Sequence, residues 1–370
     1  MTRVARLRGQ SLAIGLALGL AFASLASTGA LAAPSQPWER HNAAGLAALE
    51  ARRFAEAGQR FAVALREAER QGPETAAVAA TLENQARLMT VRGDFAEAEA
   101  RLRRALAIRQ KLHSAEDRGA DDPELATSLG RLGALAVRRH RLDRAERLLE
   151  PALASLERAL KAGDPRLAAA RNALGTLYLL QGKLAEAEPL IARALATRQR
   201  VLAPDHPDIA ESLSNLGLLR LRQNQTLEAQ ALLLKAYALR RKALKKDHPD
   251  LAESLNNLGA LDIILGRFAE AAPRLQAALR IRQRAYGPGH WEVGQTLYNL
   301  GVLYHFQGDL DRAERFYRRA LVVQQRALGP EHPDLADTLD NYADILSVTG
   351  RRVEAARLKQ RAARIRSQAG

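Results

Sequence analysis

Hydrophobic positions in this chain recur with the period of an amphipathic helix. Between Pro249 and Leu265 the leucines stand at steps of four, three and three, which places them on one helical face. Gly266 interrupts the pattern, and a second apolar face with the same period starts at Phe268. The pattern therefore predicts two helices joined by a short turn, which is a helical hairpin.

The hairpin pattern recurs every 42 residues. A small residue marks the first helix of each unit, at Gly133, Gly175, Gly217, Gly259, Gly301 and Ala343. An alanine marks the second helix twelve residues later, at Ala145, Ala187, Ala229, Ala271, Ala313 and Ala355. Small side chains at both places allow two helix axes to approach closely. A repeat of this length predicts an all-α solenoid of stacked hairpins rather than separate globular domains.

Two less regular units precede this series. Gly45 with Ala57, and Ala86 with Ala98, mark them at a spacing of 41 residues. The longest predicted loop follows them, from His113 to Asp121. In total, residues 40–370 are predicted to form eight hairpins, at about 40–70, 75–112, 123–162, 165–203, 207–245, 249–286, 291–328 and 333–368.

The first 32 residues have the pattern of a secretory signal peptide. Three arginines precede an apolar run from Leu12 to Leu25, and residues Ala30 to Ala32 form a small-residue cleavage site. We expect cleavage after Ala32, a short linker over residues 33–39, and a periplasmic or secreted mature protein without a transmembrane segment. The alternative is that the segment is retained as an uncleaved membrane anchor.

The sequence offers little for catalysis. Cysteine is absent, which excludes disulfides, thiolate metal sites and a cysteine nucleophile. No phosphate-binding loop of the GxxxxGK type, nucleophile elbow or HExxH motif occurs. Four histidines lie one repeat apart, too far for one metal ion to reach together: His206, His248, His290 and His332. We expect a protein that is not an enzyme and has no catalytic residues, cofactor or metal site.

The chain is strongly basic, with 56 Lys and Arg residues against 41 Asp and Glu residues and a net charge of +15. Such an excess can attract nucleic acid, anionic lipid or an acidic protein. Export would separate the chain from nucleic acid, which disfavours that partner. The alternative is that many arginines only solvate outer helix faces, among them Arg101, Arg103, Arg104 and Arg109.

Two units carry the residues of a known repeat family. One holds Leu174, Gly175, Tyr178, Ala187, Ile191 and Ala194, and another holds Leu300, Gly301, Tyr304, Ala313, Tyr317 and Ala320. With the phrase HPDLAESLNNLG at residues 248–259, they resemble the 42-residue tetratricopeptide repeats of kinesin light chains and their bacterial relatives. The resemblance covers nearly all of the chain after residue 32 and implies a right-handed superhelical solenoid. Asp262 departs from the pattern, because it replaces an aromatic residue.

In tetratricopeptide arrays the first helices line a concave groove. The resemblance implies that residues two and three positions before the small residue face a bound peptide. The candidate groove residues are Asn215, Asn257, Asn299, Asn341, Asn256, Tyr298, His305, Phe306, Asp337 and Asp340. Asparagine amides can pair with any peptide backbone, aromatic side chains can form pockets, and the aspartates would favour a basic ligand. Alternatively, the asparagines bond a neighbouring helix and Phe306 packs inside its hairpin.

These features predict a scaffold that binds a protein or an extended peptide in its groove, outside the cytoplasm. A competing hypothesis is an accessory or regulatory subunit of an envelope enzyme or complex, with any catalysis on another chain. In both hypotheses the function of the chain is to hold another protein.

Overall fold

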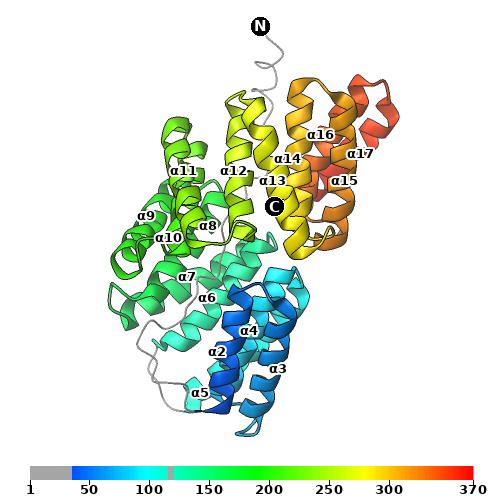
Figure 1. Ribbon diagram of the computed structural model, residues 1–370. Helices are drawn as coiled ribbons and strands as arrows, with labels where there is room; N and C mark the ends of the chain where they lie inside the picture. The colour runs from blue at the N-terminus through cyan, green and yellow to red at the C-terminus, as the bar shows by residue number, and fades with distance from the viewer. Residues whose placement is uncertain (1–35, 116–120, 370) are drawn as a thin grey trace. The chain divides into compact units, whose positions relative to one another are not determined.

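The computed structural model describes residues 36–115 and 121–369, and all regular secondary structure within them is helical (Figure 1). Contacts between helices divide the chain into two compact units. The unit that ends at Pro204 contains α2 (Pro37–Glu50), α3 (Phe54–Glu69), α4 (Ala76–Arg92), α5 (Phe95–Ala115), α6 (Pro123–Arg138), α7 (Leu142–Ala159), α8 (Pro165–Leu180) and α9 (Leu184–Val201). The unit that begins at Asp205 contains α10 (Pro207–Arg222), α11 (Thr226–Ala243), α12 (Pro249–Ile264), α13 (Phe268–Tyr286), α14 (Trp291–Gln307), α15 (Leu310–Leu328), α16 (Asp334–Val348) and α17 (Arg352–Ala369).

Consecutive helices pair into hairpins within each unit. The first hairpin is α2 with α3 and the last is α16 with α17, and we number them one to eight along the chain. Inside a unit, the second helix of each hairpin packs against the first helix of the next, as α7 packs against α8. The first helices of neighbouring hairpins also touch, as α12 and α14 do. The prediction of an all-α fold of about eight helical hairpins is confirmed.

Two boundaries differ from the sequence prediction. Helix α2 begins at Pro37, inside the expected linker of residues 33–39, because Gln36 caps it and Trp38 packs against the neighbouring hydrophobic cluster. Helix α5 continues to Ala115, so it takes in the first residues of the loop expected from His113 to Asp121. The predicted signal peptide, residues 1–32, lies outside the described residues and stays a prediction.

Among residues 36–115 and 121–369, no helix combines the length and the apolar character that crossing a membrane requires.

The recurring histidines stand at the starts of first helices, where they act as caps. The Nδ1 atom of His248 accepts a hydrogen bond from the backbone N–H of Asp250 at 3.2 Å, and His206 and His290 do the same for Asp208 and Glu292. A cap of this kind satisfies one of the backbone N–H groups that the first turn of a helix leaves without a partner. Helix capping therefore accounts for the repeated spacing of these histidines.

The recurring glycines mark the closest approach of the two helices in a hairpin. A Cβ atom placed on Gly259 would lie 2.7 Å from Cγ of Leu275, which is 16 residues later in the partner helix. Gly175 meets Ile191 at the same separation along the chain, again at 2.7 Å. Real Cβ atoms essentially never come this close to another heavy atom, so the contact requires glycine.

Replacing Gly259 by Leu is expected to lower the free energy of unfolding by about 1–3 kcal/mol, because the new side chain overlaps Leu275. Urea unfolding followed by circular dichroism would measure the loss. Gly130→Leu is the matched control, because a Cβ atom at Gly130 in α6 meets nothing within 4 Å. Equal stability of the Gly259→Leu chain and the parent would contradict the close crossing of α12 and α13.

Buried arginines recur 42 residues apart, a feature that the sequence analysis did not predict: Arg198, Arg240 and Arg282 are at most 2% exposed. Arg240 and Arg282 each connect their hairpin to the next one. Nη1 of Arg282 donates to Oγ1 of Thr296 at 2.6 Å, and Nη1 of Arg240 donates to Oγ of Ser254 at 2.9 Å. Each hydroxyl lies in the first helix of the following hairpin, so the guanidinium group bridges two repeats.

Two other hairpins carry a different residue at the position of the buried arginine, and the contact with the next hairpin differs accordingly. In hairpin seven the position holds Gln324, whose Oε1 atom accepts a hydrogen bond from Thr338 at 2.8 Å. In hairpin three it holds Leu156, and the hydroxyl position in the next helix is then Ala170. Both residues of this apolar pair are buried in one hydrophobic cluster. The chain therefore contains a polar and an apolar version of the same contact between repeats.

Candidate functional site

Three of the asparagines expected in the groove lie at contacts between neighbouring first helices: Asn256, Asn299 and Asn341. Nδ2 of Asn299 donates to Oδ1 of Asn256 at 3.1 Å, and Nδ2 of Asn341 donates to the hydroxyl oxygen of Tyr298 at 2.8 Å. Asn299 and Asn341 each stand two positions before the small residue of their own repeat. Each contacts the residue that stands three positions before the small residue of the preceding repeat. Asn215 and Asn257 are also buried. For Asn299 and Asn341 the structure therefore favours the alternative in which these amides join adjacent repeats.

The aromatic groove candidates belong to the hydrophobic core of hairpins six to eight. Tyr298 is 3% exposed, its ring centroid lies 6.0 Å from that of Tyr317, and burial raises the pKa of its hydroxyl. His305 is partly buried edge-on to Tyr317, and burial lowers the pKa of its imidazole. Phe306 packs near Phe268, with ring centroids 6.3 Å apart. Tyr298 therefore lies in the core and Phe306 packs against a ring of the preceding hairpin, while their part in binding a peptide stays a prediction.

The acidic groove candidates already have basic partners within the chain. Arg366 in α17 reaches both Asp337, at 3.0 Å, and Asp340, at 2.6 Å. Asp344 pairs with Lys359 of the same helix at 2.9 Å. The carboxylates that were expected to attract a basic ligand are therefore already paired with basic residues of α17. Arg366 lies 29 residues after Asp337 along the chain.

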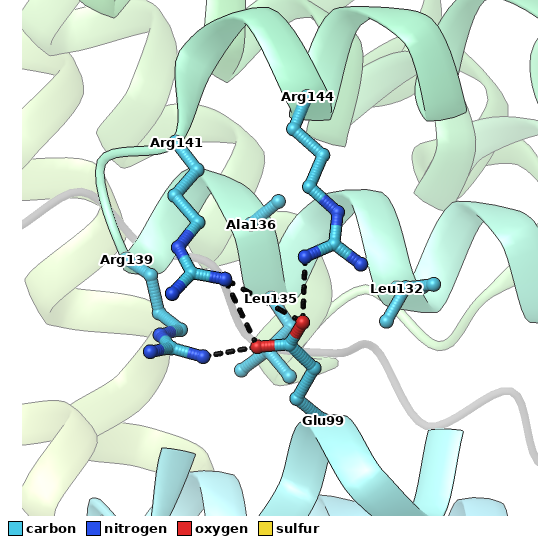
Figure 2. Close-up of a pocket in the computed structure, with 7 residues that line it drawn as sticks. All are labelled: Glu99, Leu132, Leu135, Ala136, Arg139, Arg141 and Arg144. Atoms are coloured by element: carbon cyan, nitrogen blue, oxygen red, sulfur yellow. Dashed lines mark hydrogen bonds and ion pairs between the residues drawn. The ribbon is translucent and has the colours of Figure 1, made fainter. Parts of the chain in front are cut away.

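Another group of charged residues converges where hairpins two and three meet. The carboxylate of Glu99 in α5 contacts four guanidinium groups, those of Arg103, Arg139, Arg141 and Arg144. We call Glu99 and these four arginines the arginine cluster. Figure 2 shows Arg139, Arg141 and Arg144 pointing toward the Glu99 carboxylate from the turn between α6 and α7 and from the start of α7. The carboxylate oxygens lie 2.6 Å from Arg144 and 3.2 Å from Arg141. Arg103 adds a contact of 2.6 Å from the next turn of α5.

The electrostatics of the arginine cluster are dominated by its excess of positive charge. Burial opposes ionisation of Glu99, but the hydrogen bond and the charge of Arg144 outweigh it and hold the pKa of Glu99 below its usual value. Burial and the nearby charge of Arg141 lower the pKa of Arg139, although Glu99 acts in the opposite direction. Burial is the larger of the two causes that lower the pKa of Arg139, and the charge of Arg141 adds to it.

Comparison with known repeat families assigns the hairpins. A Tetratricopeptide repeat profile matches residues 124–198, 166–242, 225–284, 250–323 and 292–368, and a second Tetratricopeptide repeat profile matches residues 78–124. The chain belongs to the tetratricopeptide repeat family. The segments matched by the first profile include Arg139, Arg141 and Arg144 of the arginine cluster and all of the groove candidates.

Solved structures with a similar arrangement of helices include two Rap proteins. The Rap protein complexed with Competence and Sporulation Factor is 13% identical over 90% of this chain and 86% of its own, with a TM-score of 0.65. The apo form of RapI is 12% identical over 78% of this chain and 97% of its own, with a TM-score of 0.55. BtubC (BKLC) from P. vanneervenii is 26% identical over 65% of this chain and 91% of its own, with a TM-score of 0.46. Comparison with curated proteins gives no significant match.

The arginine cluster was not predicted, although the tetratricopeptide register contains a signal for it. The sequence analysis gave as an alternative that Arg103 only solvates an outer face; its side chain is 59% exposed and also pairs with Glu99. Most other second helices carry glutamate at the position of Arg144, for example Glu186 and Glu228, and hairpin seven carries Arg312 there. Comparing the repeats column by column would therefore have identified Arg144 as one of two arginines at a position that otherwise holds glutamate.

Proposed function

We propose that this tetratricopeptide repeat protein is a scaffold that binds another protein or peptide outside the cytoplasm, without catalysis of its own. The observation that carries the proposal is that repeat matches extend from residue 78 to residue 368 and account for most of the chain. Stacked hairpins of this kind present long surfaces to a partner. A protein of the same fold, the Rap protein, has been crystallised with Competence and Sporulation Factor.

The location outside the cytoplasm rests on the order of features in residues 1–32. A basic start, an apolar run and a small-residue site together are the pattern that the export machinery recognises. The proposal is that cleavage after Ala32 releases the repeat region.

Crosslinking in the native host, followed by mass spectrometry, tests both parts of the proposal. We expect a specific protein to be recovered with the chain, crosslinked to residues of the hairpins, and we expect the chain's first peptide to begin at Ala33. Samples prepared without crosslinker are the control. Recovery of the chain alone would contradict the scaffold function, and an intact Met1 would contradict cleavage. A captured enzyme whose activity changes on binding would instead identify a regulatory subunit.

A further inference from the structure

The arginine cluster has an equivalent one hairpin later, which shows how much of it is needed to join repeats. There, Glu146 in α7 accepts hydrogen bonds from Gln181 at 2.7 Å and from Lys183 at 2.6 Å. These two residues occupy the positions of Arg139 and Arg141 in the following repeat. In both places, a glutamate in the second helix of one hairpin contacts the turn of the next hairpin. This repeated contact explains the presence of Arg139 and Arg141 beside Glu99.

The other two arginines of the cluster have acidic counterparts. Arg103 and Arg144 correspond to Glu150 and Glu186, once the five extra residues between hairpins two and three are allowed for. The arginine cluster therefore places four positive charges around one negative charge. The equivalent contact of the next repeat has three negative charges and one positive charge. Because that contact joins its hairpins without an excess of arginine, joining hairpins does not account for Arg103 and Arg144.

A small residue beside the cluster leaves space that the next repeat fills. Ala136 occupies the position of Tyr178, whose hydroxyl group bonds Glu150 at 2.7 Å and whose ring lies 5.2 Å from Nζ of Lys183. With alanine in place of that ring, a shallow dip remains at the surface of hairpin three, too narrow to hold a water molecule. Figure 2 shows its lining, which is Glu99, Leu132, Leu135, Ala136, Arg139, Arg141 and Arg144.

The hydrogen-bonding capacity of the cluster exceeds what Glu99 can use. A guanidinium group has five N–H donors, and a carboxylate has two oxygens that accept about four hydrogen bonds. Four guanidinium groups around one carboxylate therefore present many more donors than Glu99 can accept. Arginine forks match the geometry of carboxylate and phosphate groups, and such charge-assisted hydrogen bonds are stronger than neutral ones.

We propose that the arginine cluster binds an acidic side chain of a protein partner at the dip beside Ala136, where the partner's carboxylate pairs with the solvent-facing donors of the arginines. The inference rests on the proposed scaffold function and assigns part of its partner contact to the junction of hairpins two and three. The side chains of Arg103 and Arg141 are 59% and 44% exposed, so their donors can reach such a partner. A partner segment with several acidic residues also satisfies the arginines at the rim.

The test measures binding of a fluorescein-labelled peptide of alternating Glu and Ser to the purified full chain by fluorescence anisotropy. We expect saturable binding that weakens as salt rises, because the contact is ionic. The same peptide with Gln in place of Glu is expected to bind at least about tenfold more weakly. Equal affinity for the Glu and Gln peptides would overturn the proposal.

Charge reversal at the two unexplained positions tests whether the cluster is the site. The double variant Arg103→Glu with Arg144→Glu reproduces the residues of the next repeat, and we expect it to weaken binding of the Glu peptide about tenfold or more. The charge-matched control is Arg315→Glu with Arg318→Glu, two exposed arginines of α15. Equal losses in both double variants would show that only the net charge matters, and the site would be rejected.

Ala136→Tyr tests whether the ligand contacts the arginines at the dip. This variant keeps every arginine but adds the ring that the next repeat carries, which would cover that side of the cluster, so binding of the Glu peptide is expected to fall about as far as in the charge reversal. Unchanged binding would reject contact at the dip. Circular dichroism melting curves of all variants must match the parent, and Arg144→Gln replaces the charge reversal if that double variant melts early.

Two further outcomes identify other ligands or separate this inference from the scaffold function. If inorganic phosphate displaces the peptide better than chloride at equal ionic strength, the site takes phosphate and the carboxylate assignment is overturned. If the double variant still captures the native partner with undiminished yield, the scaffold function stands and the assignment of this contact falls. Absence of any captured partner with the parent chain contradicts the scaffold function itself.

Discussion

Replacing Arg282 by Leu is expected to lower the free energy of unfolding by about 3–5 kcal/mol, the cost of removing one partner of a buried charged contact. The side chain is fully buried and donates to Oγ1 of Thr296 and to the backbone oxygen of Glu292, at 2.6 and 2.9 Å. Its Nε atom also lies 3.0 Å from the carboxylate of Glu292. Leucine leaves these polar groups buried without their donor, so the contact between hairpins six and seven weakens.

A second substitution is expected to restore much of this loss. Thr296→Ala removes the hydroxyl group that Arg282→Leu leaves without its donor, and the double variant reproduces the natural pair Leu156 and Ala170. Replacing both partners of a buried polar contact by apolar groups of suitable shape can be nearly neutral. A double-mutant cycle from urea unfolding would measure the coupling, which we expect to exceed about 1 kcal/mol. Additive losses would show that the two residues do not act together.

The repeat spacing was sufficient to predict the fold because its signals are local. Gly259 and Leu275 lie 16 residues apart, so the small residue and the residue packed on it fall within one hairpin. Proline and an acidic residue at the start of a helix act over a single turn. Local signals of this kind repeat with the unit, and they can be recognised before the packing of the hairpins is known.

Contacts between hairpins were harder to predict, because an amphipathic pattern does not say which neighbour a polar side chain reaches. Arg282 stands among other arginines in α13, and only the structure shows that it is buried while Arg284 belongs to the polar face. Within hairpin eight, Asp337 and Asp340 of α16 likewise pair with Arg366 of α17, 29 residues after Asp337. Such pairings depend on how neighbouring helices are rotated against each other.

The contacts that the candidate groove residues make within the fold were not predicted, for a related reason. The resemblance to tetratricopeptide repeats identified the face on which Asn299 and Tyr298 lie, but not the distance between neighbouring first helices. That distance is short enough for direct hydrogen bonds between repeats. The arginine cluster was missed because its meaning depends on comparing Arg144 and Ala136 with their equivalents, and not on the properties of either residue alone.

Tyr298→Ala is expected to lower the free energy of unfolding by about 3–5 kcal/mol, as removal of a large buried aromatic side chain does. The ring is 3% exposed and packs against Tyr317, and its hydroxyl oxygen accepts the amide hydrogen of Asn341. An exposed binding residue would behave differently, because its loss would weaken binding of a partner and leave the stability unchanged. Urea unfolding of the purified chain therefore distinguishes the two roles of Tyr298 without knowledge of the partner.

Tyr298→Phe is the control that separates the ring from its hydroxyl group. It keeps the packing against Tyr317 and removes only the acceptor for Asn341, so we expect a loss of about 1 kcal/mol. Combining it with Asn341→Ala should add little, since both changes break the same hydrogen bond. If Tyr298→Ala unfolded at the same urea concentration as the parent, Tyr298 would not be part of the core, and its assignment to a peptide-binding groove would regain support.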